Sequence, residues 1–347
     1  MKQASIRTED QFEHFPGSRY MGSKNKIIKD IWKILENIDF KTFYDAFGGS
    51  NVVAYYMKCR GKKVFTNDFM GMSYIHSKAI VENSATILDS NDIDLLIKNQ
   101  NSYSFITDNF DGLYFNKEEN RFLENTRLNI DLLDSDYKKS IALAALVRAC
   151  IKKRPRGIFT YVGDRYNDGR RDIQKTIETH FKENVDLFNA AVFNNGRKHV
   201  AYNQNTENLR VKADVVYLDP PYYTRNSDND YVRRYHFVEG LIDKWESVEI
   251  QTYTKTKKFK SYISPFSVRT NAYSTFEKLI NTYRNSTILI SYSSNSLPTR
   301  DELVGILKNS KKNVEVTEIQ YTYSFGNQNH KIGNTNNRVK EYLFLAY

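Results

Sequence analysis

Two patterns of apolar residues alternate along the first 70 positions of this chain. Between residues 24 and 38, six isoleucine and leucine residues recur at helical spacing, which predicts an amphipathic helix. The apolar stretch 42–47 then predicts a short buried strand, followed by a helix over 51–59 and a second strand over 63–68. Such a strand–helix–strand unit implies parallel strands joined by a right-handed crossover.

The pattern changes after residue 84 and changes back near residue 198. The stretch between them has few strand signals and several helical segments, such as 137–151 and 172–188. Short strands resume afterwards, and we expect them at 199–202, 214–218, 287–291, 314–321 and 341–347. A polar, Asn-rich connection without a helix joins the last two strands, so we expect them to form an antiparallel hairpin.

A sheet interrupted by a helical insertion is the simplest account of these patterns. We therefore expect an α/β protein with a sheet domain formed by residues 1–84 and 198–347, and an inserted, mostly helical domain formed by residues 85–197. The length of 347 residues agrees with this division, because it exceeds the usual size of one domain.

The charge balance favours a polyanionic partner. The net charge is +10, and 25 Tyr and 21 Phe residues supply rings that could stack on bases, so nucleic acid is the leading candidate. Alternatively, the charge reflects solubility alone and most of the rings belong to the core.

Other classes of site lack support in the sequence. Cys59 and Cys150 have no metal-ligand spacing, and the six His residues form no HxxxH or HExxH pattern, so we expect neither a metal nor a disulfide framework. Acidic residues stand where a signal peptide would be apolar, and the most apolar run, 141–151, is too short to span a membrane. We expect a soluble, cytoplasmic protein.

The tetrapeptide Asp219-Pro220-Pro221-Tyr222 directly follows the apolar run 215–218. Chemistry in an open α/β sheet is found at the end of such a buried strand. The Asp219 carboxylate and a carbonyl of the stiff Pro pair can accept two amino hydrogens while Tyr222 stacks on a ring. This set suits a heteroaromatic amine such as adenine, although a Pro pair can also simply terminate a strand.

A glycine turn follows the first strand. Residues 45–50, Asp-Ala-Phe-Gly-Gly-Ser, open a helix where glycines let the backbone approach a ligand, but they lack the GxGxxG of a nicotinamide fold. Asp68 ends the second strand, where a carboxylate can accept from both ribose hydroxyls. Together they favour a nucleoside-bearing cofactor, whereas separately they could be a plain connection and a helix cap.

Taken in order, these motifs resemble the α class of DNA N6-adenine methyltransferases, which includes Dam-like enzymes and many restriction-modification methylases. The residues that carry the resemblance are 20–24, 45–50, Asp68, 219–222, 235–241 and 291–295. It implies a Rossmann-like sheet of seven strands with a reversed final hairpin, and S-adenosylmethionine as the methyl donor. It also implies that the insertion is a target-recognition domain and that the substrate is double-stranded DNA.

The resemblance assigns roles to individual residues. Those expected at the cofactor are Tyr20, Lys24, Asp45, Phe47, Gly48, Gly49, Ser50 and Asp68. The family usually places an acidic residue on the adenine of the cofactor shortly before the tetrapeptide strand. Amides occupy that stretch here, and Asn205 is the candidate for this contact. Asp219 and Pro220 would hold the two hydrogens of the target N6 and favour a more electron-rich nitrogen aligned with the methyl group.

The expected DNA contacts lie around the tetrapeptide and in the insertion. A base inside a duplex cannot reach this site, so we expect the target adenine to be flipped onto Tyr222. Residues expected near the flipped base or on the DNA are Tyr223, Arg225, Phe237, Lys153, Arg154, Arg156, Arg170 and Arg171. A second group of lysines over 255–260 suits backbone contacts or a solvated face equally well.

The sequence thus predicts a site-specific DNA adenine-N6 methyltransferase of a restriction-modification or genome-marking system. A separate restriction endonuclease would be the partner in the first case. Two alternatives stay open: methylation of RNA, and a catalytically silent DNA-binding subunit on the same fold. The intact Asp219 and Tyr222 argue against the second, because a silent copy has no chemical need for them.

Overall fold

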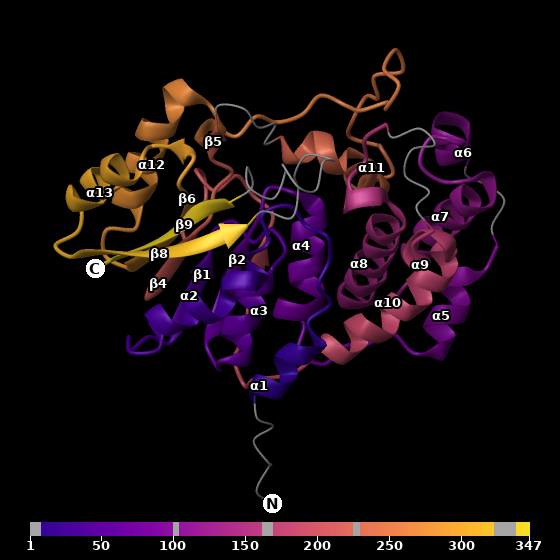
Figure 1. The fold of residues 1–347 in the computed structure, drawn as a ribbon. Helices are drawn as coiled ribbons and strands as arrows, with labels where there is room; N and C mark the ends of the chain where they lie inside the picture. Colours follow the sequence, from indigo (N-terminus) through magenta and orange to yellow (C-terminus); the bar gives the residue numbers. More distant parts are fainter. Residues whose placement is uncertain (1–7, 100–103, 162–168, 225–229, 323–337) are drawn as a thin grey trace, which may run out of the picture.

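A seven-stranded sheet forms the centre of the protein (Figure 1). The computed structural model describes residues 8–99, 104–161, 169–224, 230–322 and 338–347. The strands are β1 Thr42–Asp45, β2 Lys63–Asn67, β3 Val200–Tyr202, β4 Val215–Leu218, β6 Thr287–Ser293, β8 Val314–Thr322 and β9 Arg338–Ala346, in the order β3-β2-β1-β4-β6-β9-β8. β9 is antiparallel to both of its neighbours and the other pairs are parallel, which confirms the expected fold class.

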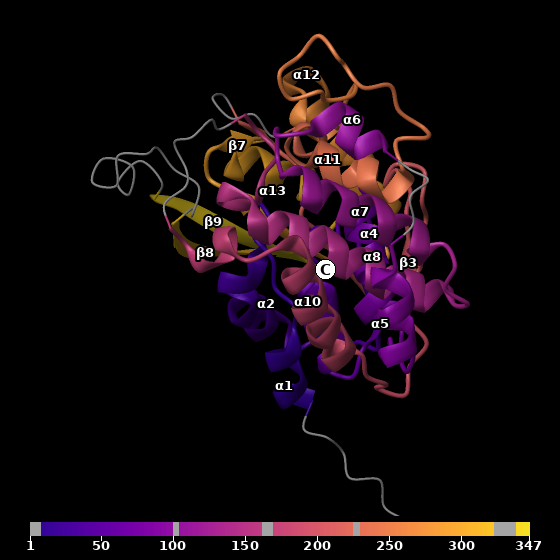
Figure 2. The same cartoon turned by 90° about the vertical axis from the view of Figure 1, so that its right-hand side faces the viewer.

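Helices flank the sheet on both faces. Those of the first half are α1 Thr8–Gln11, α2 Ile28–Leu35, α3 Val52–Cys59 and α4 Gly71–Ser77. Those within the insertion are α5 Ser90–Ile97, α6 Phe105–Phe110, α7 Lys117–Ile130, α8 Asp136–Lys153, α9 Arg171–Gln174 and α10 Ile177–Ala191. The last three are α11 Tyr231–Asp243, α12 Arg269–Thr282 and α13 Arg300–Lys308. Figure 1 shows the insertion helices gathered on one side of the sheet, away from α12 and α13, and Figure 2 looks onto that side.

The core explains why the central strands are continuous apolar runs. Val215 and Tyr217 of β4 pack in the cluster that contains α2 and α3, whereas Val216 and Leu218 pack in the cluster that contains α12 and α13. Successive side chains of a strand point to opposite faces, so both faces of this sheet are covered. In the part of the chain that the structure describes, no helix is long and apolar enough to cross a bilayer.

The strand order reverses between β1 and β4. Asp45 pairs in register with Tyr217, and the Ala46 amide donates to the Tyr217 carbonyl over 3.1 Å. The carboxyl ends of these two strands therefore share one edge, at the position where open α/β sheets bind ligands. Next to it, β5 Tyr223–Thr224 pairs with β7 Ser296–Leu297 and ties the segment after the tetrapeptide to the segment after β6.

Candidate active site

A buried lysine joins the tetrapeptide to the last strand of the sheet. Lys24 lies at the start of the 3-10 turn η2 Lys24–Ile27, and its Nζ is 2.8 Å from Asp219 Oδ1 and 3.4 Å from Glu341 Oε1. The same ammonium donates to the Gly22 carbonyl over 3.2 Å, while Ser291 Oγ donates to Glu341 Oε1 over 2.8 Å. All three donors of the lysine thus face acceptors, which fixes the Asp219 carboxylate at the end of β4.

The charges in this group shift one another. Burial raises the pKa of Asp219 to about 6, with Glu341 adding to the rise and Lys24 opposing it. Burial on its own lowers the pKa of Lys24, but the two carboxylates outweigh it and hold that pKa well above its usual value. The lysine is therefore a permanent cation between two carboxylates. Lys24 was expected at the cofactor, and in the structure its ammonium contacts the tetrapeptide through Asp219.

The remaining residues of the tetrapeptide line the same edge of the sheet. Pro220 is buried, whereas Pro221 and Tyr222 are half-buried. The Tyr222 ring meets the ring of Tyr292 in β6 edge-on, with 5.2 Å between the centroids. Tyr223 begins β5 and pairs with Leu297. The structure thus brings the tetrapeptide together with the stretch 291–295.

The glycine turn and Asp68 also come together. The Gly49 amide donates to Asp68 Oδ2 over 2.7 Å, and the Met70 amide donates to Asp68 Oδ1 over 2.8 Å. Gly49 has a φ of +50°, and a Cβ there would lie 3.1 Å from Tyr20 Cε1, so only glycine lets the turn approach that ring. The hydroxyls of Ser23 and Ser50 lie 3.1 Å apart beside it.

Acidic groups at this edge exceed the cations that face them. Burial raises the pKa of Asp45 to about 8, with Asp219 adding to the rise. Burial likewise raises the pKa of Asp68 to about 6, against the effect of the Met70 and Gly49 amides. In the part of the chain that the structure describes, neither carboxylate forms an ion pair with Lys or Arg. A cationic ligand would therefore be stabilised here.

Other expected cofactor contacts surround the turn. Gly48 is buried, and a Cβ there would lie 2.8 Å from Asn51 Oδ1. The half-buried Phe47 packs edge-on against Phe266. Asn205 Nδ2 donates to the Tyr262 hydroxyl over 2.9 Å, so it lies at the same carboxyl edge of the sheet.

Several residues at the site escaped the sequence analysis. Phe69 directly follows Asp68, and its ring stacks on the ring of Tyr262 with 4.5 Å between the centroids. Both rings are exposed. Glu239 accepts from the Gly71 and Met72 amides over 2.9 and 2.8 Å, and burial raises its pKa to about 7. Glu239 stands in the stretch 235–241 that carries the resemblance, and Glu341 directly precedes the apolar stretch 342–346, but neither residue was assigned a role from the sequence.

Of three residues expected on the substrate, Arg154 and Phe237 are buried and Lys153 is half-buried. Arg154 is 5% exposed, and its guanidinium donates to the carbonyls of Tyr114 and Thr160 over 3.0 and 3.2 Å. Lys153 forms an ion pair with Glu119 at 2.6 Å. The fully buried Phe237 belongs to an aromatic cluster, so its ring has no open face for a base. These side chains serve packing and internal hydrogen bonding in this conformation.

The other expected substrate residues are placed differently. Arg156, Arg170 and Arg171 are exposed, and Arg156 has a left-handed backbone with a φ of +61°. Arg225 lies outside the described residues. A basic run therefore contains both interior and surface arginines, and the sequence spacing does not separate them.

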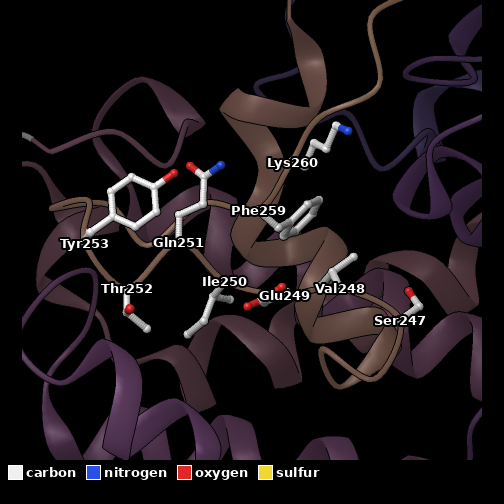
Figure 3. A pocket seen from close by; sticks show the side chains of 9 residues that line it. All are labelled: Ser247, Val248, Glu249, Ile250, Gln251, Thr252, Tyr253, Phe259 and Lys260. Carbon is white, nitrogen blue, oxygen red and sulfur yellow. The ribbon is translucent and has the colours of Figure 1, made fainter.

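A pocket lies in the segment 244–264 between α11 and α12 (Figure 3). Its volume is about 520 Å³, and it is lined by Ser247, Val248, Glu249, Ile250, Gln251, Thr252, Tyr253, Phe259 and Lys260. Tyr253 on its wall is 84% exposed, and Lys255 Nζ lies 5.2 Å from the centroid of the Tyr161 ring. Among the described residues, no three His, Cys, Asp or Glu side chains are grouped to hold a metal ion.

Comparison with known proteins gives consistent matches. Residues 20–306 match the family model for D12 class N6 adenine-specific DNA methyltransferase. Type II methyltransferase M2.HphI of Haemophilus parahaemolyticus is 33% identical over 96% of this chain and 98% of the relative. Modification methylases StsI of Streptococcus sanguinis and LlaI of Lactococcus lactis subsp. lactis are each 25% identical, over 87% and 90% of this chain. The chain spans about half of these two relatives, 48% and 52% of their lengths.

Proposed function

Because this chain belongs to the D12 class of N6 adenine-specific DNA methyltransferases, we propose that it methylates N6 of adenine at a specific site in duplex DNA, with S-adenosylmethionine as the donor. It acts in a restriction-modification system, as the names of its relatives indicate. A separate restriction endonuclease would be its partner. The observation that carries the proposal is the Asp219 carboxylate, fixed at the switch point of the sheet beside the buried Asp45 and the half-buried Asp68.

The residues around the glycine turn fit S-adenosylmethionine. Its ammonium and sulfonium groups are cations, which would lower the raised pKa values of Asp45 and Asp68 and stabilise the ionised carboxylates that no described Lys or Arg pairs with. The Asp68 carboxylate keeps lone pairs for ribose hydroxyls after accepting from two amides. Phe69 and Tyr262 offer aromatic faces for a purine, and Asn205 offers an amide beside them. When bound, the cofactor supplies an electrophilic methyl group.

The chemistry of the tetrapeptide supports adenine as the target. Asp219 and the Pro220 carbonyl provide two acceptors for the two N6 hydrogens, and the half-buried ring of Tyr222 provides a face for stacking. Holding both hydrogens fixes the direction of the N6 lone pair, which places the nucleophile for in-line attack. The target base has to leave the helix to reach this edge of the sheet.

The DNA surface is proposed from the exposed cations. Arg156, Arg170 and Arg171 from the insertion are exposed, and so is Lys255 in the segment 244–264. The nearby Tyr253 offers an exposed ring for stacking. Cations and rings on two separate segments could contact the backbone on both sides of a flipped base. Residues 85–197 remain our proposal for the target-recognition domain.

A pair of arginine variants separates interior from surface roles. We expect Arg154→Ala to lower the unfolding free energy by about 1–3 kcal/mol, because it leaves the Tyr114 and Thr160 carbonyls without a donor. The salt dependence of DNA binding should not change. Arg156→Ala should keep the stability and reduce the slope of log K against log salt by about 0.9, the value of one phosphate contact. Fluorescence anisotropy over a salt series measures the slope, and an unchanged slope for Arg156→Ala would remove that residue from the DNA surface.

Transfer of a labelled methyl group tests the proposed function directly. The purified protein is incubated with labelled S-adenosylmethionine and matched duplex DNA, single-stranded DNA or RNA, and the products are digested to nucleosides. We expect label in N6-methyladenine from duplex DNA. Transfer to RNA alone, or DNA binding without transfer, would overturn the proposal in favour of an RNA enzyme or a silent subunit.

A further inference from the structure

We infer that Glu341 is a positioning residue for methyl transfer, a role that depends on the function proposed above. It acts through Lys24 and keeps the Asp219 carboxylate available to the adenine amino group. Glu341 lies in β9 and is 1% exposed, yet it faces Lys24 Nζ at 3.4 Å and accepts from Ser291 Oγ at 2.8 Å. Its strand is otherwise apolar where it crosses the core, as at Leu343 and Phe344.

The charge count explains what Glu341 contributes. With Lys24 between two carboxylates, the group carries a net charge of −1. Without Glu341, the ammonium would neutralise Asp219 completely and bind it more strongly. Lys24 would then compete with the adenine N–H groups for the same oxygens, in an interior where charges are weakly screened. Glu341 therefore divides the attraction of Lys24 between two acceptors.

A negative group at this point suits the course of the reaction. As the new N6–carbon bond forms, the sulfur–carbon bond of the donor breaks and its electron pair stays on sulfur. Positive charge develops on N6, and N6 then loses one of its two hydrogens as a proton. The Asp219 carboxylate is placed to stabilise that charge, accept the proton and release it to solvent.

The groups that face Asp219 predict how its acidity responds. They are Lys24 from η2, Glu341 from β9, Asp45 from β1 and Tyr217 from β4. Burial is the main reason for its raised pKa, and Glu341 adds to it as a like charge. Replacing Glu341 by a neutral side chain therefore lowers the pKa of Asp219 and makes this carboxylate a weaker base.

The test is a Glu341→Gln variant, which keeps the size of the side chain and its hydrogen bonding to Ser291. We expect kcat to fall about tenfold or more, the effect of weakening one charged hydrogen bond. The KM for S-adenosylmethionine and the DNA dissociation constant should change less than about twofold. The acid limb of the pH–kcat profile should move to lower pH, and Glu341→Asp should restore part of the activity.

Glu318→Gln is the matched control, because it makes the same chemical change in β8. Glu318 pairs with the surface residue Lys340 at 2.9 Å, and we expect this variant to behave as the unaltered enzyme. In the unliganded protein, carboxyl ¹³C NMR titration should show a lower pKa for Asp219 in Glu341→Gln than in the control.

The outcomes are separable. The inference is overturned if Glu341→Gln changes neither the pKa of Asp219 nor the acid limb of the pH–kcat profile. This holds even if kcat and thermal stability both fall, because that result would describe a structural role for Glu341. If the unaltered protein transfers no methyl group to DNA, the proposed function fails, and the NMR titration still decides whether Glu341 controls Asp219.

Discussion

An Asp219→Ala variant is expected to lose at least about a hundredfold in kcat, the scale seen when one group that stabilises a transition state is removed. One of the two N6 hydrogens would lose its acceptor, and the neighbouring Lys24 cation would face the amino nitrogen instead of a carboxylate. Both changes oppose positive charge on N6. Transfer of labelled methyl to duplex DNA measures the loss, and calorimetry should show nearly unchanged affinity for S-adenosylmethionine.

The control for this variant lies at the other end of the same strand. Asp214 precedes β4, and its carboxylate accepts from the Lys41 and Thr42 amides over 2.9 and 2.8 Å. Asp214→Ala should lower stability and leave kcat within about twofold of the unaltered enzyme, since this end carries no reacting group. Full activity in Asp219→Ala would contradict the role of its carboxylate and with it the proposed mechanism.

The second large effect is expected on stability, from a Lys24→Met variant. Removing the cation leaves the carboxylates of Asp219 and Glu341 close together without a cation between them, and breaking such a buried ion pair costs about 3–5 kcal/mol of unfolding free energy. Chemical denaturation near neutral pH measures it. Lys29→Met, which changes an exposed lysine in α2, should cost less than about 0.5 kcal/mol.

The pH dependence of that loss has a definite sign. Without Lys24, the folded-state pKa of Asp219 rises further above its unfolded value, because the cation that opposes the rise is gone. A carboxyl with a raised folded pKa binds more protons when folded, so the variant gains stability relative to the unaltered protein as pH falls through the pKa of Asp219. Adding Glu341→Gln to Lys24→Met should recover part of the loss at neutral pH. A loss that is independent of pH and of Glu341 would assign it to packing instead.

The parts of the fold that are buried on both faces were predictable from sequence. The strands expected at 42–47, 63–68 and 214–218 appear as β1, β2 and β4, and the clearest of them is β4, in which all four residues are apolar and buried. The helix expected over 172–188 is instead divided into α9 and α10 at Lys175 and Thr176, where Thr176 caps the second helix. Capping is a local contact that competes with helical periodicity.

The site was predictable where chemistry follows chain order, and less so where it depends on tertiary contacts. Asp68 and Asp219 stand out in the sequence because each directly follows a strand, and the structure places both at the carboxyl edge of the sheet. The burial of Arg154 could not, because its neighbour Arg156 has the same residue type and an exposed position. Tyr262 reaches Phe69 across nearly 200 positions of sequence, and no local pattern marks that contact.

The position of β9 bears on when the protein becomes competent during synthesis. Although β9 is the last strand along the chain, it lies inside the sheet between β6 and β8. A ribosome-bound chain can form the parallel half of the sheet early, but Lys24 lacks one of its two carboxylates until residue 341 has emerged. In the unfinished polypeptide, Lys24 would therefore pair with Asp219 alone, and we expect methylation to begin only after β9 is inserted into the sheet.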